Sequence, residues 1–393
     1  MTNFLAVERA LRTAAPYDLL PAARAALAEY YGALYVDLLL VDYSSKVLQS
    51  VTGAPAGGRP LPVRGSAEGR AFDSRERVQT VRHEGSIEMH VPVTAHGDRL
   101  GILSVRLPEE KAPPHVVDEI TAIADVIGHE ILVAERDTDV YLQARRANRL
   151  TLAAEVQWDL LPGRACGGKE YAIGAQLEPA YAIYGDNFDW AETENTLTLS
   201  VTNGMGEGIQ AALLTSLAVN ALRNARRAGI GIADQAALAD QALFAQYRGE
   251  EYVATLLLSF DLDTGRVEVV DGGSPQLWRH RGKTVEHVPF DAQLPLGMFE
   301  ETDYVTQEFQ VVPGDRLVFV SDGVFAALSD KGEAFGEKML GRAIQAARLL
   351  PAAAVPRAIL QELSEYLDAG PGPEVGDDAL VLCLDWFGRD ARA

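Results

Sequence analysis

Cysteine is scarce in this sequence, and its scarcity excludes two kinds of architecture. Cys166 and Cys383 are the only cysteines among 393 residues. They lie far apart and form no CxxC pair, so the sequence predicts neither a disulfide framework nor a zinc site. A chain of this composition suits a reducing compartment, and we expect a cytoplasmic protein.

Long apolar runs are also missing. The first 20 residues mix Glu8, Arg9 and Arg12 among their apolar side chains. No later stretch reaches the roughly 18 uninterrupted apolar residues of a membrane-spanning helix. The sequence therefore predicts neither an export signal nor membrane insertion.

Basic residues are too few to balance the acidic ones. The chain has 35 Lys and Arg against 56 Asp and Glu, which gives a formal net charge of -21. Nucleic acid and anionic lipid are negatively charged and would repel this chain. We therefore expect no nucleic-acid or membrane partner and favour a basic partner. The hydrophobic content of 48% is enough for packed cores. The length predicts two domains.

The first part of the chain, to about residue 135, alternates short β-rich runs with helical ones. Two strands and a helix start are predicted at residues 33–41, 47–51 and 65–72. Residues 88–93 and 100–105 flank a segment whose glycine and aspartate suit a tight connection between antiparallel strands. We predict an α+β domain with a central sheet.

A helical pattern follows, from residue 114 to about residue 161. Its apolar residues recur at spacings of three and four, at Val117, Ile120, Ala124, Ile127, Ile131, Leu142, Leu150, Val156 and Leu160. We predict one long helix that connects two domains. Such a helix either forms a parallel dimer seam or packs on its own domain, and the pattern leaves both open.

Beyond Pro162 the composition changes to strands and glycine turns. Short β runs are predicted at residues 196–202, 254–261, 266–270, 316–321 and 379–385. Helices are predicted at residues 208–228 and 233–247, with more helix between 337 and 367. Antiparallel strands sandwiched between helices are the expected layout.

Four acidic or near-acidic clusters lie at the ends of these strands. They are YGDNFD at 184–189, NGMGEG at 203–208, SDG at 321–323 and GDD at 376–378. Carboxylates brought together repel one another unless cations neutralise them, and oxygen-rich sites suit Mg²⁺ or Mn²⁺. Two such ions can hold a bridging hydroxide and polarise a phosphoryl oxygen. Each motif alone is an ordinary turn, so their order and separation carry the signal.

The first region resembles a GAF domain over roughly residues 17–136. The resemblance rests on GSAEGRAFDSRERVQT at 65–80 and VPVTAHGDRLGILSVRLPE at 91–109. It implies an α/β/α sensor domain that binds an unknown small molecule or dimerises. His83 and His90 are candidates for reaching a ligand pocket, with a surface or hydrogen-bonded core histidine as the alternative for each.

The second region resembles the SpoIIE-type branch of the metal-dependent protein phosphatase 2C (PPM) family over roughly residues 148–387. Seven motifs carry the resemblance in order: EVQWDLLP, LEPAYAIYGDNFDW, NGMGEGIQAALLTSLA, DGGSPQLW, QLPLGMF, PGDRLVFVSDGVFAAL and GDDALVLCL. It implies an α-β-β-α sandwich. The predicted organisation is a sensor domain at 1–136, a connecting signalling helix at 137–162 and a phosphatase-like domain at 163–393.

The same resemblance implies a site for two Mn²⁺ or Mg²⁺ ions. Asp186 would bind one ion, Asp322 and Asp377 the other, and the Gly204 carbonyl would add a ligand. Asn203 stands where the family has the aspartate that bridges both ions. Two further acids would support the site or bind a weaker ion, Asp378 and Asp189.

Departures from the family pattern concentrate around that bridging position. An amide offers one neutral oxygen where a carboxylate offers two anionic ones, so Asn203 should lower metal affinity. Glu207 stands where the family has His or Lys. It either turns inward to attract a cation or lies exposed at a helix entry, where the helix dipole favours it. Gly273-Ser274-Pro275 replaces a common Gly-His-Pro.

Two functions follow from the resemblance. The first is a phosphoserine/phosphothreonine protein phosphatase in bacterial signal transduction, acting on a partner such as an anti-sigma-factor antagonist under control of the GAF-like domain. The second is a pseudophosphatase, a dimeric binding or regulatory protein with little catalysis, and Asn203 motivates it. A homodimer through the connecting helix fits either function.

Overall fold

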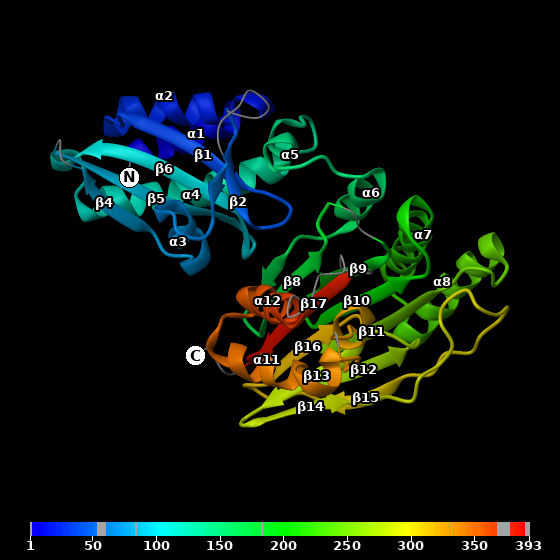
Figure 1. Ribbon diagram of the computed structural model, residues 1–393. Coiled ribbons are helices and arrows are strands. Elements are labelled where there is room, and N and C mark those ends of the chain that lie inside the picture. Colours follow the sequence, from blue (N-terminus) through cyan, green and yellow to red (C-terminus); the bar gives the residue numbers. More distant parts are fainter. Residues whose placement is uncertain are drawn as a thin grey trace. The chain divides into compact units, whose positions relative to one another are not determined.

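The computed structural model describes residues 2–52, 60–82, 85–181, 184–329, 331–367 and 378–389. The chain divides into two compact units, Met1–Arg149 and Leu150–Ala393 (Figure 1). Within these described ranges, no helix combines the length and the apolar character needed to cross a membrane.

The first unit is built on one antiparallel sheet with the strand order β3-β2-β1-β6-β5-β4. Its strands are β1 (Tyr35–Val41), β2 (Val47–Ser50), β3 (Leu61–Pro62), β4 (Val78–Arg82), β5 (Ser86–Ala95) and β6 (Asp98–Pro108). Its helices include α1 (Thr2–Thr13), α2 (Leu19–Tyr31), α3 (Ala67–Ser74) and α4 (Pro114–Ala134).

Both faces of this sheet are buried. Successive side chains of a strand point to opposite faces. Leu38 and Leu40 of β1 accordingly join the core formed with α1, α2 and α4. Leu39 and Val41 join a second core that contains Phe72 of α3. The predicted α+β domain with a central sheet is confirmed.

The predicted hairpin is formed by β5 and β6. His96 and Gly97 connect the two strands, and both have positive φ angles, of 49° and 90°. Positive φ at both central residues is the requirement of a type I′ turn, which matches the twist of the flanking strands. The strands are longer than predicted because Ala95 already pairs with Asp98.

The single continuous helix predicted over residues 114–161 is wrong. The segment contains three separate helices: α4 (Pro114–Ala134), α5 (Val140–Ala144) and α6 (Leu152–Leu160). Residues 135–139 are Glu-Arg-Asp-Thr-Asp and supply no apolar side chain to continue the buried stripe. Thr151 starts α6 afresh, since its side chain accepts a hydrogen bond from the Ala154 N–H at 3.1 Å.

The two later helices are held by different units. Tyr141 of α5 is fully buried, and its hydroxyl donates to the Pro16 carbonyl of the first unit at 2.7 Å. Gln49 donates to the Ala144 carbonyl at 3.0 Å. Trp158 of α6 donates instead to the Ala180 carbonyl of the second unit at 2.8 Å. The alternative in which the helical segment packs on its own domain therefore holds for α5 and α6.

The second unit contains two antiparallel sheets, with orders β15-β12-β11-β10-β9 and β14-β13-β16-β17-β8-β7. The first sheet comprises β9 (Asp186–Glu192), β10 (Thr196–Gly204), β11 (Val253–Asp261), β12 (Arg266–Asp271) and β15 (Gln307–Gln310). The second comprises β7 (Ala165–Gly167), β8 (Tyr171–Glu178), β13 (Gln276–Arg281), β14 (Thr284–Val288), β16 (Arg316–Val320) and β17 (Ala379–Trp386).

Helices cover the outer face of each sheet. The core under α7 (Gly208–Arg227) and α8 (Ile232–Tyr247) includes Leu257 of β11. The core under α11 (Leu340–Ala346) and α12 (Val355–Leu367) includes Val318 of β16. Between the sheets, the rings of Phe260 and Trp386 stack with their centroids 6.1 Å apart. The predicted α-β-β-α sandwich is confirmed (Figure 1).

Candidate metal and catalytic site

Asp186 and Asn203 lie side by side on neighbouring strands. Asp186 begins β9, Asn203 is the penultimate residue of β10, and the antiparallel register pairs them directly. Residues paired in this way project to the same face, with Cβ atoms about 4.5–5.5 Å apart. Asp186 is buried and Asn203 is partly exposed, so the pair opens toward solvent on the Asn203 side.

Asp322 joins this pair from the other sheet. It follows β16 as the first residue of the short helix α9 (Asp322–Phe325). The Asn203 Nδ2 donates to Asp322 Oδ1 at 2.5 Å, and the Gly323 N–H donates to the same oxygen at 3.0 Å. Three side chains that the sequence assigned to one site, Asp186, Asn203 and Asp322, are thus linked where β9, β10 and β16 meet.

Glycines allow the backbone to close tightly here. The Gly204 N–H donates to the Gly185 carbonyl at 3.1 Å. A Cβ on Gly185 would lie 2.1 Å from the Gly204 carbonyl oxygen, a distance that no side chain tolerates. The Gly204 carbonyl, a predicted metal ligand, therefore lies against the residue that precedes Asp186.

Asp378 holds the loop that delivers Asp186. Its Oδ2 accepts three backbone N–H groups, from Tyr184 at 2.6 Å, Gly185 at 2.8 Å and Asp186 at 3.1 Å. The side chain is buried, and hydrogen bonds to a charged acceptor are stronger than neutral ones. One oxygen of Asp378 therefore fixes the backbone at Asp186.

The Asp189 carboxylate forms ion pairs with two arginines of α7. Its carboxylate accepts from Arg223 at 2.7 Å and from Arg226 at 2.9 Å, and its side chain is 3% exposed. Arg223 also donates to the Leu160 carbonyl at the end of α6, at 2.5 Å. Asp189 therefore joins β9, α7 and α6, a structural role that differs from the predicted binding of a weaker ion.

Asp377 lies outside the described residues, as does His83. Within the part of the chain that the structure describes, no three His, Cys, Asp or Glu side chains gather closely enough to hold an ion. Among described residues, the predicted site contains the carboxylates of Asp186 and Asp322 and the amide of Asn203, with Asp378 beside them engaged by backbone N–H groups.

These donors fit a hard divalent cation. Carboxylate, amide and backbone carbonyl oxygens are the ligands that Mg²⁺ and Mn²⁺ prefer. When ionised, the carboxylates of Asp186 and Asp322 carry two negative charges, which balance one divalent ion. The amide of Asn203 adds no charge. The described donors therefore suit one ion better than two.

Glu207 does not turn into the site. It is exposed and occupies the N-cap position of α7 without a side-chain capping bond. An acidic residue at that end interacts favourably with the helix dipole. The exposed alternative for Glu207 is confirmed.

His90 is a core residue and does not reach a ligand pocket, which is the alternative given for it. It is 2% exposed, and its Nδ1 lies 2.9 Å from Ser104 Oγ on the neighbouring strand. The side chain is a hydrogen-bonded core histidine.

Thr215 and Arg223 support the site, and sequence reasoning missed both. Thr215 is fully buried in α7, and its hydroxyl donates to the Gly185 carbonyl at 2.8 Å. A Cβ on Gly204 would lie 2.2 Å from that hydroxyl oxygen, so α7 and β10 meet closely. For Arg223, the sequence does contain a signal: Arg223 and Arg226 are three residues apart, which places two cations on one face of α7 and indicates an acidic partner.

A family model matches the second unit. Residues 193–387 match the family model of stage II sporulation protein E (SpoIIE). The match supports a SpoIIE-type domain of the protein phosphatase 2C class in this unit.

Two curated relatives are both from Bacillus subtilis (strain 168). The phosphoserine phosphatase RsbU is 22% identical over 252 residues, which cover 63% of this chain and 74% of RsbU. The phosphoserine phosphatase RsbP is 24% identical over 158 residues, 39% of each chain. Among solved structures, the SiaA-PP2C domain of Pseudomonas aeruginosa is 21% identical with a TM-score of 0.49, and the alignment covers 60% of this chain and 94% of that one.

Proposed function

We propose that this protein is a metal-dependent protein serine/threonine phosphatase of bacterial signal transduction. The observation that carries the proposal is the meeting of Asp186, Asn203 and Asp322 at the ends of three strands. Asn203 and Asp322 lie within the region that matches the SpoIIE family model, and Asp186 pairs with that region. The similarity to two phosphoserine phosphatases supports phosphoserine as a substrate.

In this proposal, Asp186 and Asp322 hold Mn²⁺ or Mg²⁺, with Asn203 and Gly204 as neutral oxygen donors and Asp377 as a further carboxylate. A bound ion would supply an electrophile for the phosphoryl oxygen and acidify a water nucleophile. The chain's own groups orient the donors. Asp378 fixes the backbone at Asp186, and Asn203 donates to Asp322. We expect no covalent intermediate.

The proposed substrate is a phosphorylated partner protein of the anti-sigma-factor-antagonist type, and the proposed regulator is the GAF-like first unit with its small-molecule ligand. A coupling route is available inside the second unit. Arg223 bonds both the end of α6 and Asp189. Asp189 lies on the strand that Asp186 begins. A shift of α6 would therefore act on the strand that carries a metal-binding carboxylate. A cytoplasmic homodimer is part of the same proposal.

Metal removal tests the catalytic part. Phosphate release from a phosphoserine peptide by the full chain should require Mn²⁺ or Mg²⁺, stop in EDTA and return when the ion is restored. Titration calorimetry with Mn²⁺ gives an independent readout of the site. Undiminished release in EDTA would contradict a metal-dependent mechanism.

Removal of the first unit tests the regulatory part. A chain lacking residues 1–149 should differ from the full chain by about threefold or more in phosphate release, or differ in oligomeric state measured by light scattering. Regulation by the first unit loses its support if both quantities stay the same.

A specific observation favours the second candidate, a pseudophosphatase. The Asn203 amide donates to Asp322 Oδ1, so one carboxylate oxygen is already engaged by a neutral neighbour. A protein with this arrangement would keep the fold and a phosphopeptide cleft but do little catalysis. Robust Mn²⁺-dependent turnover by the natural chain rejects this candidate.

A further inference from the structure

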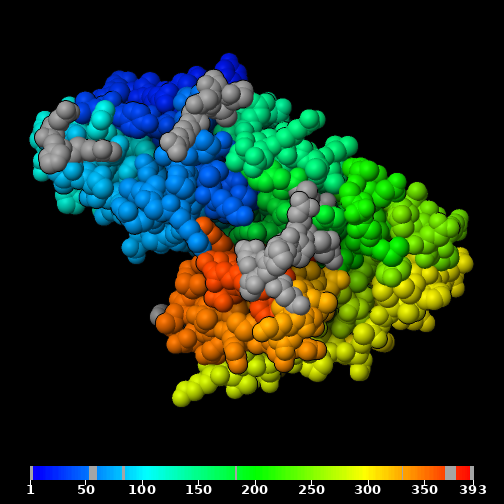
Figure 2. Space-filling view, in the orientation of Figure 1, coloured from blue at the N-terminus to red at the C-terminus, as the bar shows by residue number. Residues whose placement is uncertain are grey.

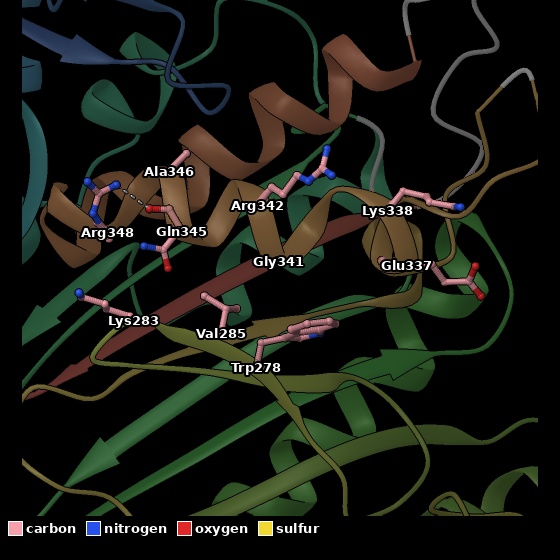
Figure 3. Close-up of a pocket in the computed structure, with 11 residues that line it drawn as sticks. Trp278, Lys283, Val285, Glu337, Lys338, Gly341, Arg342, Gln345, Ala346 and Arg348 are labelled. Atoms are coloured by element: carbon pink, nitrogen blue, oxygen red, sulfur yellow. Dashed lines mark hydrogen bonds between the residues drawn. The ribbon is translucent and has the colours of Figure 1, made fainter.

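A groove on the second unit gathers basic side chains away from the candidate metal site. It lies between the β13–β14 hairpin and the helical segment that runs from α10 (Phe335–Lys338) through α11, and its volume is about 600 Å³ (Figure 3). We call it the basic groove. Its lining includes Lys283, Lys338, Arg342 and Arg348, and none of its lining residues belongs to the metal site.

The basic groove is positively charged, whereas the chain as a whole is negatively charged. Four cations line it with a single acid, Glu337, although the net charge of the chain is -21. Lys338 pairs with Glu333 at 3.4 Å. Among the described residues, Lys283, Arg342 and Arg348 form no ion pair. Three exposed cations are therefore left uncompensated.

The floor of the groove is apolar. Trp278 and Val285 lie on the sheet side and face the helical segment that carries Arg342 (Figure 3). The Trp278 indole donates to Gln276 Oε1 at 3.2 Å, so its polar edge is satisfied. Gly341 of α11 closes over the indole, because a Cβ added there would meet the ring at 3.8 Å, an ordinary van der Waals contact. Trp278 and Val285 pack against the core under α11 and α12, so the groups that the groove offers to a ligand are its charges.

The cations are spread along the groove rather than gathered at one point. Lys338 ends α10, and α11 with the helical turn after it separates Lys338 from Arg348 by about 12 Å at a rise of about 1.5 Å per residue. Figure 3 shows Lys338 at one end, Arg342 in the middle, and Lys283 and Arg348 at the other end. An extended peptide covers that length with about four or five residues. One phosphate group would need converging donors instead.

We propose that the basic groove binds an extended acidic segment of a partner protein. Its carboxylates would pair with Lys283, Arg342 and Arg348. The proposal holds for a catalyst and for a binding protein, because no residue of the metal site takes part in it.

The test uses the full chain and a fluorescein-labelled peptide of sequence EDLEDE, with QNLQNQ as the neutral counterpart. Fluorescence anisotropy should show saturable binding of the acidic peptide that weakens as salt is added, because exposed ion pairs are screened. The neutral peptide should not bind.

Paired charge reversals then locate the site. Lys283→Glu with Arg342→Glu should weaken peptide binding at least about tenfold, since two attractions become repulsions. Lys169→Glu with Arg227→Glu is the matched control. Lys169 lies in the turn between β7 and β8 as Lys283 lies in the turn between β13 and β14, and Arg227 is an exposed helix residue like Arg342. The control should stay within about twofold of the natural chain. Circular dichroism should show the natural fold for every variant.

Three results would overturn the proposal. They are equal binding of the neutral peptide, equal loss of affinity in the two charge-reversal pairs, and ATP binding that is tighter than peptide binding and disappears in Lys283→Glu with Arg342→Glu. The last result would assign a nucleotide site instead.

Discussion

Replacing Asn203 by aspartate is expected to raise Mn²⁺-dependent phosphate release by about ten- to a hundredfold, the range by which altered metal environments change metal affinity or activity. The substitution adds an anionic oxygen between Asp186 and Asp322, where the natural chain offers a neutral amide. The site would then carry three negative charges among its described residues. It would hold two divalent ions more readily. Phosphate release from a phosphoserine peptide is the direct measurement.

The same variant should make stability depend on metal. Without an ion, Asn203→Asp loses the 2.5 Å hydrogen bond to Asp322 and places two carboxylates together, which repel. Its melting temperature should therefore fall below that of the natural chain. Added Mn²⁺ should raise the melting temperature again. At a Mn²⁺ concentration a hundred times the dissociation constant, binding adds about 2.7 kcal/mol to the free energy of unfolding.

A matched substitution separates a local effect from added charge. Asn224→Asp places the same carboxylate on an exposed position of α7 and should change neither activity nor Mn²⁺ affinity. If Asn203→Asp gains no activity and no metal-dependent stability, Asn203 is not the position that limits metal binding. If only the variant is active, the natural chain is the binding protein of the second candidate function.

Removing the Asp378 carboxylate is expected to destabilise the second unit by about 3–5 kcal/mol. In Asp378→Ala, the N–H groups of Tyr184, Gly185 and Asp186 lose the buried carboxylate that accepts their hydrogen bonds. An unsatisfied buried donor costs about 1–3 kcal/mol. Urea denaturation of the full chain measures the change, read on the transition that belongs to the second unit, since two units can unfold separately.

The isosteric variant and a surface control sharpen this test. Asp378→Asn keeps one oxygen acceptor and should lose about 1–2 kcal/mol, less than the alanine variant. Asp303→Ala, at an exposed position, should change the free energy of unfolding by less than about 0.5 kcal/mol. An Asp378→Ala chain of natural stability that no longer binds Mn²⁺ would show that Asp378 serves the ion and not the loop.

The sequence was most informative where chemistry and strand ends coincide. Asp186, Asn203 and Asp322 were predicted together because each follows or begins a short β run in an order typical of one family, and the structure links them. The roles of Asp378 and Asp189 were less accessible. An aspartate in a sequence does not reveal its partner, and the Asp378 carboxylate binds amides as far as 194 residues away.

The connecting segment shows where periodicity misleads. Spacings of three and four continue from Val117 to Leu160, yet the apolar residues belong to three helices that two different units hold. Periodicity records which side chains are buried, not whether the helix between them is intact. The break depends on polar residues 135–139 and on the Thr151 cap.

The basic groove was likewise beyond reach of the sequence. Lys283 lies in a hairpin turn, whereas Lys338, Arg342 and Arg348 lie in a helical segment much later in the chain. Only the packing of that segment over β13 and β14 brings their charges to one groove.

The interruption of the connecting segment also determines where either unit can be fused to a different protein. Each unit keeps its own share of the linker: Tyr141 ties α5 to the first unit, and Arg223 ties the end of α6 to the second. A gene fusion cut at residue 162 would strip the second unit of α6 and uncover the side chains against which Ala154 and Gln157 are buried. A fusion point between Arg145 and Thr151 leaves both cores whole, so a new input module is best grafted there.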